Sequence, residues 1–280
     1  MKPYPIIWIF PLLLGCKKVP IVPQKLLLWS FENIELEPIA ERRVQTDWET
    51  SGWGIYEDII FPGDEIEWNV SHDQLESVPV LNCQITGGDA YNNVFFTNTI
   101  ASKSEGSEWY FQEANYFEFE IEFYPATFID CDNSDRSQIE GMEFTFQHVI
   151  IPDSWGWGIQ WSKTNTWSYW DDQKIDSKPR GWVKIPTLDG CLSWNTWNRL
   201  SLSGKQSGNQ LIYQRLSVNE QTIDLNIQLP SVTVPDGWAE NFIQVGFQIN
   251  GNKALLTDHQ QGVDPVTIFL KNVNLKVYED

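Results

Sequence analysis

The chain has 280 residues, with 38 acidic against 19 basic side chains and a formal net charge of −19. This charge argues against nucleic acid as a partner, because phosphate binding requires a basic surface, and against adsorption to anionic lipid. Aromatic residues make up 14% of the chain and include 15 tryptophans. Flat aromatic rings favour strands and also stack on the C–H faces of sugars, so the composition fits both a plain β-sandwich and a carbohydrate-binding protein.

The first residues, MKPYPIIWIFPLLLGC, have the layout of a secretory signal. Lys2 gives a short positive region, and residues 6–14 form an apolar run that is too short to span a bilayer. The run ends in LLGC, which resembles the lipobox of bacterial lipoproteins. The resemblance implies cleavage before Cys16, lipid on that cysteine and anchoring to the outer membrane or the cell surface. The alternative is an ordinary secretory signal that contains a cysteine.

These features predict three segments. Residues 1–15 are expected to be the signal peptide, and residues 16–25 a tether with two prolines. Residues 26–280 are expected to form a single domain, since they contain no linker-like stretch and no internal repeat. Contact with a membrane is expected through the lipid alone, and the oligomeric state is left open.

The expected domain is a series of strand-like runs separated by Gly, Asn, Asp and Pro. The clearest runs include VPVLNCQIT, YFEFEIEFY, GMEFTFQHVI, WGWGIQW and FIQVGFQIN. Helical periodicity does not persist beyond about one turn in any of them. Many short strands at this spacing predict an all-β fold, built as a sandwich or barrel.

Alternation within three of these runs separates an apolar face from a polar one. Residues 141–147, 155–161 and 244–250 each place aromatic or branched side chains on one face. The opposite face carries glycines, which leave room for a ligand to approach the backbone. It also carries polar side chains that can bond sugar hydroxyls. If the strands are neighbours, these side chains form the floor of a polar groove: Glu143, Gln160, Gln248 and Asn250.

The order of segments from roughly residue 115 to residue 280 resembles the concanavalin A-like lectin and glucanase superfamily. The segments are IEGMEFTFQ, GIQW, the Trp170-Asp171 loop, WNTWNRLSLSG, IQVGFQINGN and TIFLKNVNLKVY. The resemblance implies a jelly-roll of two antiparallel sheets whose concave face carries Glu143, Gln160 and Gln248. This superfamily contains lectins, glycosidases and lyases, so the fold alone does not choose among them.

Two sets of carboxylates are candidates for catalysis. Glu118, Glu120 and Glu122 share one strand face, similar to the E-x-D-x-E arrangement of the superfamily's laminarinase-like β-glucanases. Here Glu replaces the central Asp, and the flanking tryptophan of that motif is missing. A solvated outer strand face explains the same alternation. The other candidate is Glu143, although acid–base catalysis needs a second group that the sequence does not locate.

Aromatic residues after the turn-like run SKTN are expected to overhang the groove. We expect Trp167, Trp170 and Trp182 to form its rim, with a loop packed on its own aromatic cluster as the alternative. Non-covalent binding of an oligo- or polysaccharide is therefore the favoured function. A glycosidase or polysaccharide lyase is the enzymatic alternative, and a structural envelope protein without a ligand is the third.

Cysteines and acidic loops give the remaining predictions. Cys131 and Cys191 lie in polar, loop-like surroundings and are expected to pair in a disulfide, while Cys83 lies in a strand-like run. No spacing suggests zinc, and no cofactor is required. A weak calcium site is expected from Asp130, Asp132 and Asp135, with an Asx-rich turn as the alternative. His148 follows the EFTFQ run and either ends the groove or is structural.

Overall fold

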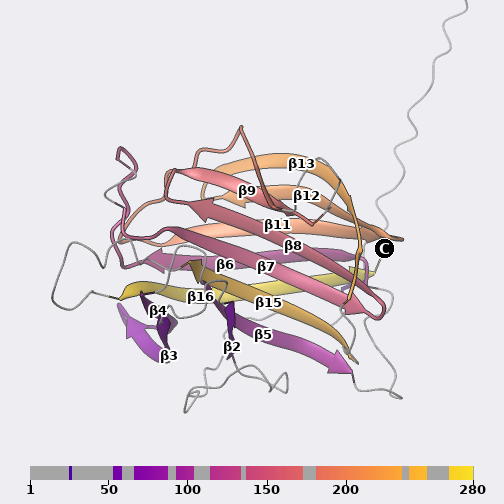
Figure 1. Cartoon of the computed structure of the whole chain (residues 1–280), viewed down its shortest axis with the longest axis horizontal. Helices are drawn as coiled ribbons and strands as arrows, with labels where there is room; N and C mark the ends of the chain where they lie inside the picture. The colour runs from indigo at the N-terminus through magenta and orange to yellow at the C-terminus, as the bar shows by residue number, and fades with distance from the viewer. Residues whose placement is uncertain are drawn as a thin grey trace, which may run out of the picture.

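The computed structural model describes the chain in nine stretches. These are residues 25–26, 53–58, 66–87, 93–103, 114–133, 137–172, 181–234, 240–250 and 265–279. The described residues form two antiparallel sheets of eight strands each, packed face to face (Figure 1). The predicted segments 1–15 and 16–25, and Cys16, lie almost wholly outside these stretches and stay predictions. In the described residues no helix is long or apolar enough to cross a bilayer.

The first sheet, called here the β6 sheet, has the strand order β13-β12-β11-β6-β16-β4-β3, and β1 also pairs with β16. Its strands are β1 (Lys25–Leu26), β3 (Ile66–Leu75), β4 (Val78–Gly87), β6 (Tyr116–Pro125), β11 (Asn198–Ser207), β12 (Gln210–Val218), β13 (Gln221–Pro230) and β16 (Val266–Glu279).

The second sheet, called here the β7 sheet, has the order β10-β9-β8-β7-β15-β5-β2, and β14 also pairs with β8. Its strands are β2 (Trp53–Asp58), β5 (Asn93–Lys103), β7 (Gly141–Ile150), β8 (Asp153–Ser162), β9 (Thr166–Asp171), β10 (Gly181–Lys184), β14 (Val232–Thr233) and β15 (Asn241–Asn250).

The chain alternates between the two sheets, so strands that are distant in sequence become neighbours. Strand β15 inserts between β7 and β5, and β16 inserts between β6 and β4. This order confirms the expected all-β, two-sheet antiparallel jelly-roll sandwich. Figure 1 shows the two layers with β7, β8 and β15 side by side.

The core lies between the sheets and follows from strand alternation. In β6, Phe117, Phe119, Ile121 and Phe123 are buried, while the glutamates between them are partly exposed. In β8, Trp155, Trp157 and Trp161 also face the core, as the alternation predicts. Each buried aromatic side chain stabilises the fold by about 1.5–3 kcal/mol through removal of apolar area from water.

One indole crosses from the β7 sheet to the β6 sheet. Trp157 Nε1 donates a hydrogen bond to the carbonyl of Ile212 at 3.1 Å. The ring fills the space next to Gly204, where an added Cβ would lie 2.3 Å from Trp157 Nε1. Gly204 on β11 is therefore required by the close approach of this ring, and the hydrogen bond to Ile212 fixes the position of β8 over β12.

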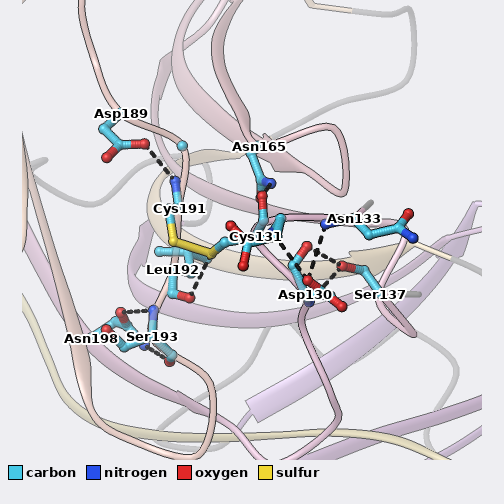
Figure 2. Close-up of a disulfide and its surroundings, with 12 residues drawn as sticks. Asp130, Cys131, Asn133, Ser137, Asn165, Asp189, Cys191, Leu192, Ser193 and Asn198 are labelled. Carbon is cyan, nitrogen blue, oxygen red and sulfur yellow. Dashed lines mark hydrogen bonds between the residues drawn. A yellow bond between two sulfur atoms is a disulfide. The ribbon is translucent and has the colours of Figure 1, made fainter. Parts of the chain in front are cut away.

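A disulfide joins the loop after β6 to the loop before β11 (Figure 2). Cys131 and Cys191, the two cysteines expected to pair, are bonded with a Cα–Cα distance of 5.3 Å. The side chain of Asn165 donates to the carbonyl of Cys131 at 2.8 Å, which ties the β8–β9 turn to the same place. Cys83 is fully buried on β4, and burial raises the pKa of its thiol.

Candidate functional site

A groove with a volume of about 1110 Å³ lies on the polar face of the β7 sheet. Its floor comes from β5, β7, β8 and β15, and its two walls come from β9–β10 and from the end of β13 together with β14. All four residues expected to form the floor line this groove: Glu143, Gln160, Gln248 and Asn250.

Strand register brings these polar side chains into one row. Glu143 on β7 lies opposite Gln160 on β8 and opposite Gln248 on β15. Gln160 Nε2 donates to Glu143 Oε1 at 3.0 Å, and Gln248 Nε2 donates to the same oxygen. Gln248 Nε2 also donates to Asn250 Oδ1 at 3.0 Å. Glu143 is 7% exposed and Gln248 is 1% exposed, so the network is a fixed part of the floor.

The network determines which hydrogen-bonding groups the floor can offer. Glu143 Oε1 accepts from both glutamines, so it orients their N–H groups toward itself. Gln160, which is partly exposed, keeps its carbonyl oxygen for other partners. A ligand with hydroxyl donors suits such a surface.

The sheet positions next to Glu143 carry no second carboxylate in the described residues. Its neighbours on the same face are Gly141 and Thr145 along β7, with Gln160 and Gln248 across. A retaining glycosidase needs two carboxyl groups about 5–5.5 Å apart, which is the spacing of adjacent positions in a sheet. The sheet positions next to Glu143 therefore supply no second carboxyl group at this spacing in the described residues.

Two further carboxylates, Glu140 and Asp172, line the groove. Glu140, just before β7, forms an ion pair with Lys163 at 2.6 Å. Asp172 follows β9 and lies beyond Trp170. The groove is thus lined by acidic groups, in keeping with the net charge of −19.

The glutamates of β6, the other set of catalytic candidates, do not line this groove. Glu118, Glu120 and Glu122 lie on the β6 sheet, on the face turned away from the core. Their partners are basic or hydroxyl groups of neighbouring strands: Arg199 at 2.9 Å from Glu120, Lys271 at 3.3 Å from Glu122, and the Tyr278 hydroxyl at 2.8 Å from Glu118. They form the solvated outer face that was the alternative.

The expected aromatic rim is corrected at Trp167. Residues 166–171 form strand β9, not a loop, and Trp167 pairs with Trp161 on the core side. Trp167 is 0% exposed, and its Nε1 donates to the carbonyl of Asp189 at 3.1 Å. The turn at residues 163–165 is short, with Asn165 at a φ of 54°, so a tight hairpin was the signal that could have placed Trp167.

Trp170 and Trp182 do lie at the groove. They are cross-strand partners on β9 and β10, with ring centroids 5.2 Å apart in an edge-to-face arrangement. Both line the groove and both are partly exposed. Gly158 lies next to both side chains, since an added Cβ there would lie 3.4 Å from Trp170 Cβ and 3.4 Å from the Trp182 ring. The two rings form an aromatic wall beside a glycine.

Tyr213 positions this wall, and sequence reasoning missed it. The side chain comes from β12 in the β6 sheet, and its hydroxyl accepts from the N–H of Gly158 at 2.9 Å. The hydroxyl also lies 3.2 Å from the carbonyl oxygen of Trp170. Burial raises the pKa of Tyr213, so the phenol remains a hydrogen-bond donor.

The remaining predicted sites lie elsewhere. Asp130 Oδ1 accepts from the backbone N–H groups of Asp132 and Asn133 at 3.0 Å, which is the Asx-turn alternative, and Asp135 lies outside the described residues. Metal-ligating side chains form no cluster of three in the stretches that the structure describes. His148 does not end the groove. It is buried on the core face, and burial lowers its pKa to about 4.

No protein-family model and no curated protein matches the chain. Among solved structures, it is similar to a β-glucanase of Bacillus licheniformis, at 10% identity and a TM-score of 0.36 over 81% of this chain and 92% of that one. It is similar to an endo-β-1,4-glucuronan lyase of the fungus Trichoderma reesei, at 12% identity and a TM-score of 0.44 over 81% and 94%. It is also similar to the alginate lyase vAL-1 of a Chlorella virus, at 12% identity and a TM-score of 0.40 over 81% and 93%.

These three structures are a glucanase and two lyases, which is the class of the enzymatic alternative and not of a binding module. At such identities and TM-scores the likeness carries no inference about chemistry.

Proposed function

We propose that this protein binds a polysaccharide non-covalently in the groove of the β7 sheet. The observation that carries the proposal is the hydrogen-bonded row of Gln160, Glu143 and Gln248 beside the partly exposed rings of Trp170 and Trp182. A sugar ring has one set of hydroxyl groups around its edge and apolar C–H groups on its faces. The polar row can hydrogen bond to the hydroxyl groups, and the aromatic wall can stack on the C–H faces.

The burial of the polar row supports binding without turnover. Glu143 holds two amides in place and lies among Gly141, Thr145 and two glutamines, so its immediate surroundings lack a proton donor of carboxylic type in the described residues. Fixed polar groups that need no rearrangement lower the entropic cost of binding.

Affinity electrophoresis of the soluble domain through gels that contain different polysaccharides tests the proposal. We expect at least one polymer to retard the protein, and a chromatographic assay of the same polymer to show no released oligosaccharide. Migration that is unchanged by every polymer in a panel of glucans, mannans, galactans, chitin derivatives and uronates would contradict the proposal.

The enzymatic alternative shares the groove and is supported by its three lining carboxylates, Glu140, Glu143 and Asp172. Released sugar, lost in Glu143→Gln and kept in Glu118→Gln on the other sheet, would select a glycosidase. An unsaturated product absorbing in the ultraviolet would select a lyase. Retardation without either product selects the binding protein.

We also propose that Cys16 carries lipid that anchors the domain to the cell envelope. The support is the LLGC motif after a short apolar run. The full chain should partition into the detergent phase of a Triton X-114 extraction, and Cys16→Ala should shift it to the aqueous phase. A wild-type chain found only in the aqueous phase would contradict the anchor.

A further inference from the structure

Strand β8 pairs with β7 along one edge, and with β9 and β14 along the other edge. One residue on this second edge pairs with neither β9 nor β14. In an antiparallel sheet, the N–H and C=O groups of alternate residues point to the same edge. The N–H and C=O of Gly158 both face the Tyr213 hydroxyl, on the edge of β8 opposite β7. The N–H and C=O of Gly156, two residues earlier, therefore face the same edge. The ladder to β9 starts at Ile159, and the ladder to β14 involves Ser154. In the described residues, Gly156 therefore has no strand partner on this edge.

Two features keep the edge open at Gly156. On one side, the Tyr213 hydroxyl stands between Gly158 and Trp170, where β8 and β9 would otherwise bond directly. On the other side, the pairing of β14 with β8 stops at Ser154, although continuing the same register would bring Pro230 opposite Gly156.

Pro230 cannot close this gap. A proline has no N–H to give to the carbonyl of Gly156, and Pro230 is paired with Gln210 in the other sheet. The chain crosses between the two sheets immediately afterwards, at Ser231.

The open position faces the groove and has apolar neighbours. Gly156 is exposed, and an added Cβ there would meet no atom within 4 Å. Leu229, Pro230 and Val232 line the groove together with Gly156. The site therefore offers one backbone donor and one backbone acceptor next to a small apolar wall.

The size of the gap decides what can bind there. A peptide that adds a strand needs several consecutive free positions, whereas the gap between Ser154 and Gly158 has one. A hydroxyl group could make one of the two bonds, but a single amide supplies an N–H and a C=O with the spacing of a backbone. An amide that ends in a methyl group would also use the apolar wall.

We propose that the groove recognises a glycan of N-acetylated amino sugars, with one acetamido group paired to Gly156 and its methyl group against Leu229 and Val232. The inference rests on the proposed function and names the class of sugar. The acidic lining of the groove suits this uncharged group and disfavours uronates, whose carboxylates would be repelled by Glu143 and Asp172.

Two β-1,4-linked hexamers that differ only in the group at C2 test the inference by isothermal titration calorimetry. They are the hexamer of N-acetylglucosamine and the hexamer of glucose. We expect the N-acetylated hexamer to bind about tenfold more tightly, because it adds two hydrogen bonds to the backbone. Equal affinity, tighter binding of the glucose hexamer, or no binding of the N-acetylated hexamer overturns the inference.

A pair of variants at one position separates the amide contact from the rest of the groove. Gly156→Pro removes the N–H at an edge where no ladder bond is lost, and Gly156→Ala keeps it. The affinity for the N-acetylated hexamer divided by the affinity for the glucose hexamer should fall to about one in the proline variant. In the alanine variant the same ratio should keep its wild-type value. A ratio that persists in a folded proline variant, judged by circular dichroism, overturns the inference.

Val232→Thr provides a second variant that does not alter the strand backbone. It exchanges a methyl group for a hydroxyl on the apolar wall and should reduce the preference for the N-acetylated hexamer about twofold to threefold. An unchanged preference would overturn the assignment of the methyl group to this wall.

These outcomes are distinct from failure of the proposed function. If another polysaccharide retards the protein in gels while the N-acetylated hexamer does not bind, the proposed function stands and the inference fails. If no polysaccharide of the panel binds, both fail.

Discussion

Tyr213 in the β6 sheet hydrogen bonds to Gly158 in the β7 sheet, with 2.9 Å between the hydroxyl and the backbone nitrogen. The contact joins the core to the candidate site, because Gly158 lies in the groove floor and the same hydroxyl is 3.2 Å from the carbonyl oxygen of Trp170. One side chain from the opposite sheet therefore sets the position of a floor residue and of a wall residue.

Tyr213→Phe should lower both stability and affinity. It leaves the buried N–H of Gly158 without its acceptor, which costs about 1–3 kcal/mol of unfolding free energy. It also releases the backbone of Trp170, so the affinity for the bound polysaccharide should fall. Urea unfolding and gel retardation measure the two effects.

Tyr124→Phe is the matched control for this prediction. Its hydroxyl donates to Asn195 Oδ1 at 2.6 Å, at a site outside the groove lining. Stability should fall by about 0.5–1.5 kcal/mol, with unchanged retardation. If both variants bind like the wild type, Tyr213 does not position the wall.

Gly204→Ala should destabilise the fold, whereas Gly156→Ala should not. A methyl group at Gly204 would lie 2.3 Å from Trp157 Nε1, and a methyl group at Gly156 would meet nothing within 4 Å. Overpacking of this kind costs about 1–3 kcal/mol, because the ring is held between the sheets. Denaturant midpoints measure the difference, and equal midpoints would show that the indole moves aside easily.

Stability should fall as the pH drops below the ordinary histidine range, because His148 is buried as a neutral side chain. Burial lowers its pKa to about 4 in the folded state, partly offset by the hydrogen bond with Gln206. Between the unfolded pKa, about 6.5, and the folded value, the unfolded chain binds the extra proton. The stabilisation is complete above the unfolded pKa and is lost as pH falls toward about 4.

The expected loss from this one group is on the order of 3 kcal/mol. Urea unfolding between neutral and acidic pH, compared between the wild type and His148→Gln, isolates it from the carboxylates. The unfolding free energy of His148→Gln should change less than that of the wild type across the same pH range. An identical pH dependence in the two proteins would show that His148 does not contribute.

Removal of the disulfide should reduce stability without affecting the groove. Cys131 and Cys191 are 60 residues apart, and the crosslink restricts the unfolded chain over that length. The double variant Cys131→Ser/Cys191→Ser should lose about 2–4 kcal/mol. A reducing agent should lower the wild type to the same value and leave the variant unchanged. An unchanged stability of the wild type in the reducing agent would contradict this role.

Alternation along single strands was enough to predict part of the site. In each of three strands, polar residues and glycines alternate with apolar residues and so share one face of that strand. The polar residues on these faces are Glu143, Gln160, Gln248 and Asn250. Their meeting depends on strand order, which alternation does not give, and in the structure β7 lies between β8 and β15.

Other features depend on contacts that a sequence pattern does not contain. Alternation places Glu118, Glu120 and Glu122 on an outer face, but it does not say which sheet carries that face. The sequence predicts a loop at Trp167 because the residue follows the turn-like run SKTN, whereas in the structure it lies on strand β9. Tyr213 reaches Gly158 from 55 residues away, so its role became visible only from the packing of the two sheets.

The central claim is that the groove binds a polysaccharide against its aromatic wall. The affinity of Trp170→Ala for the polysaccharide that retards the wild-type protein tests this claim most directly. Trp194→Ala is the matched control, because Trp194 is 46% exposed and lies outside the groove lining. We expect Trp170→Ala to weaken binding about tenfold or more, while Trp194→Ala binds like the wild type. Wild-type affinity in a folded Trp170→Ala protein would contradict it.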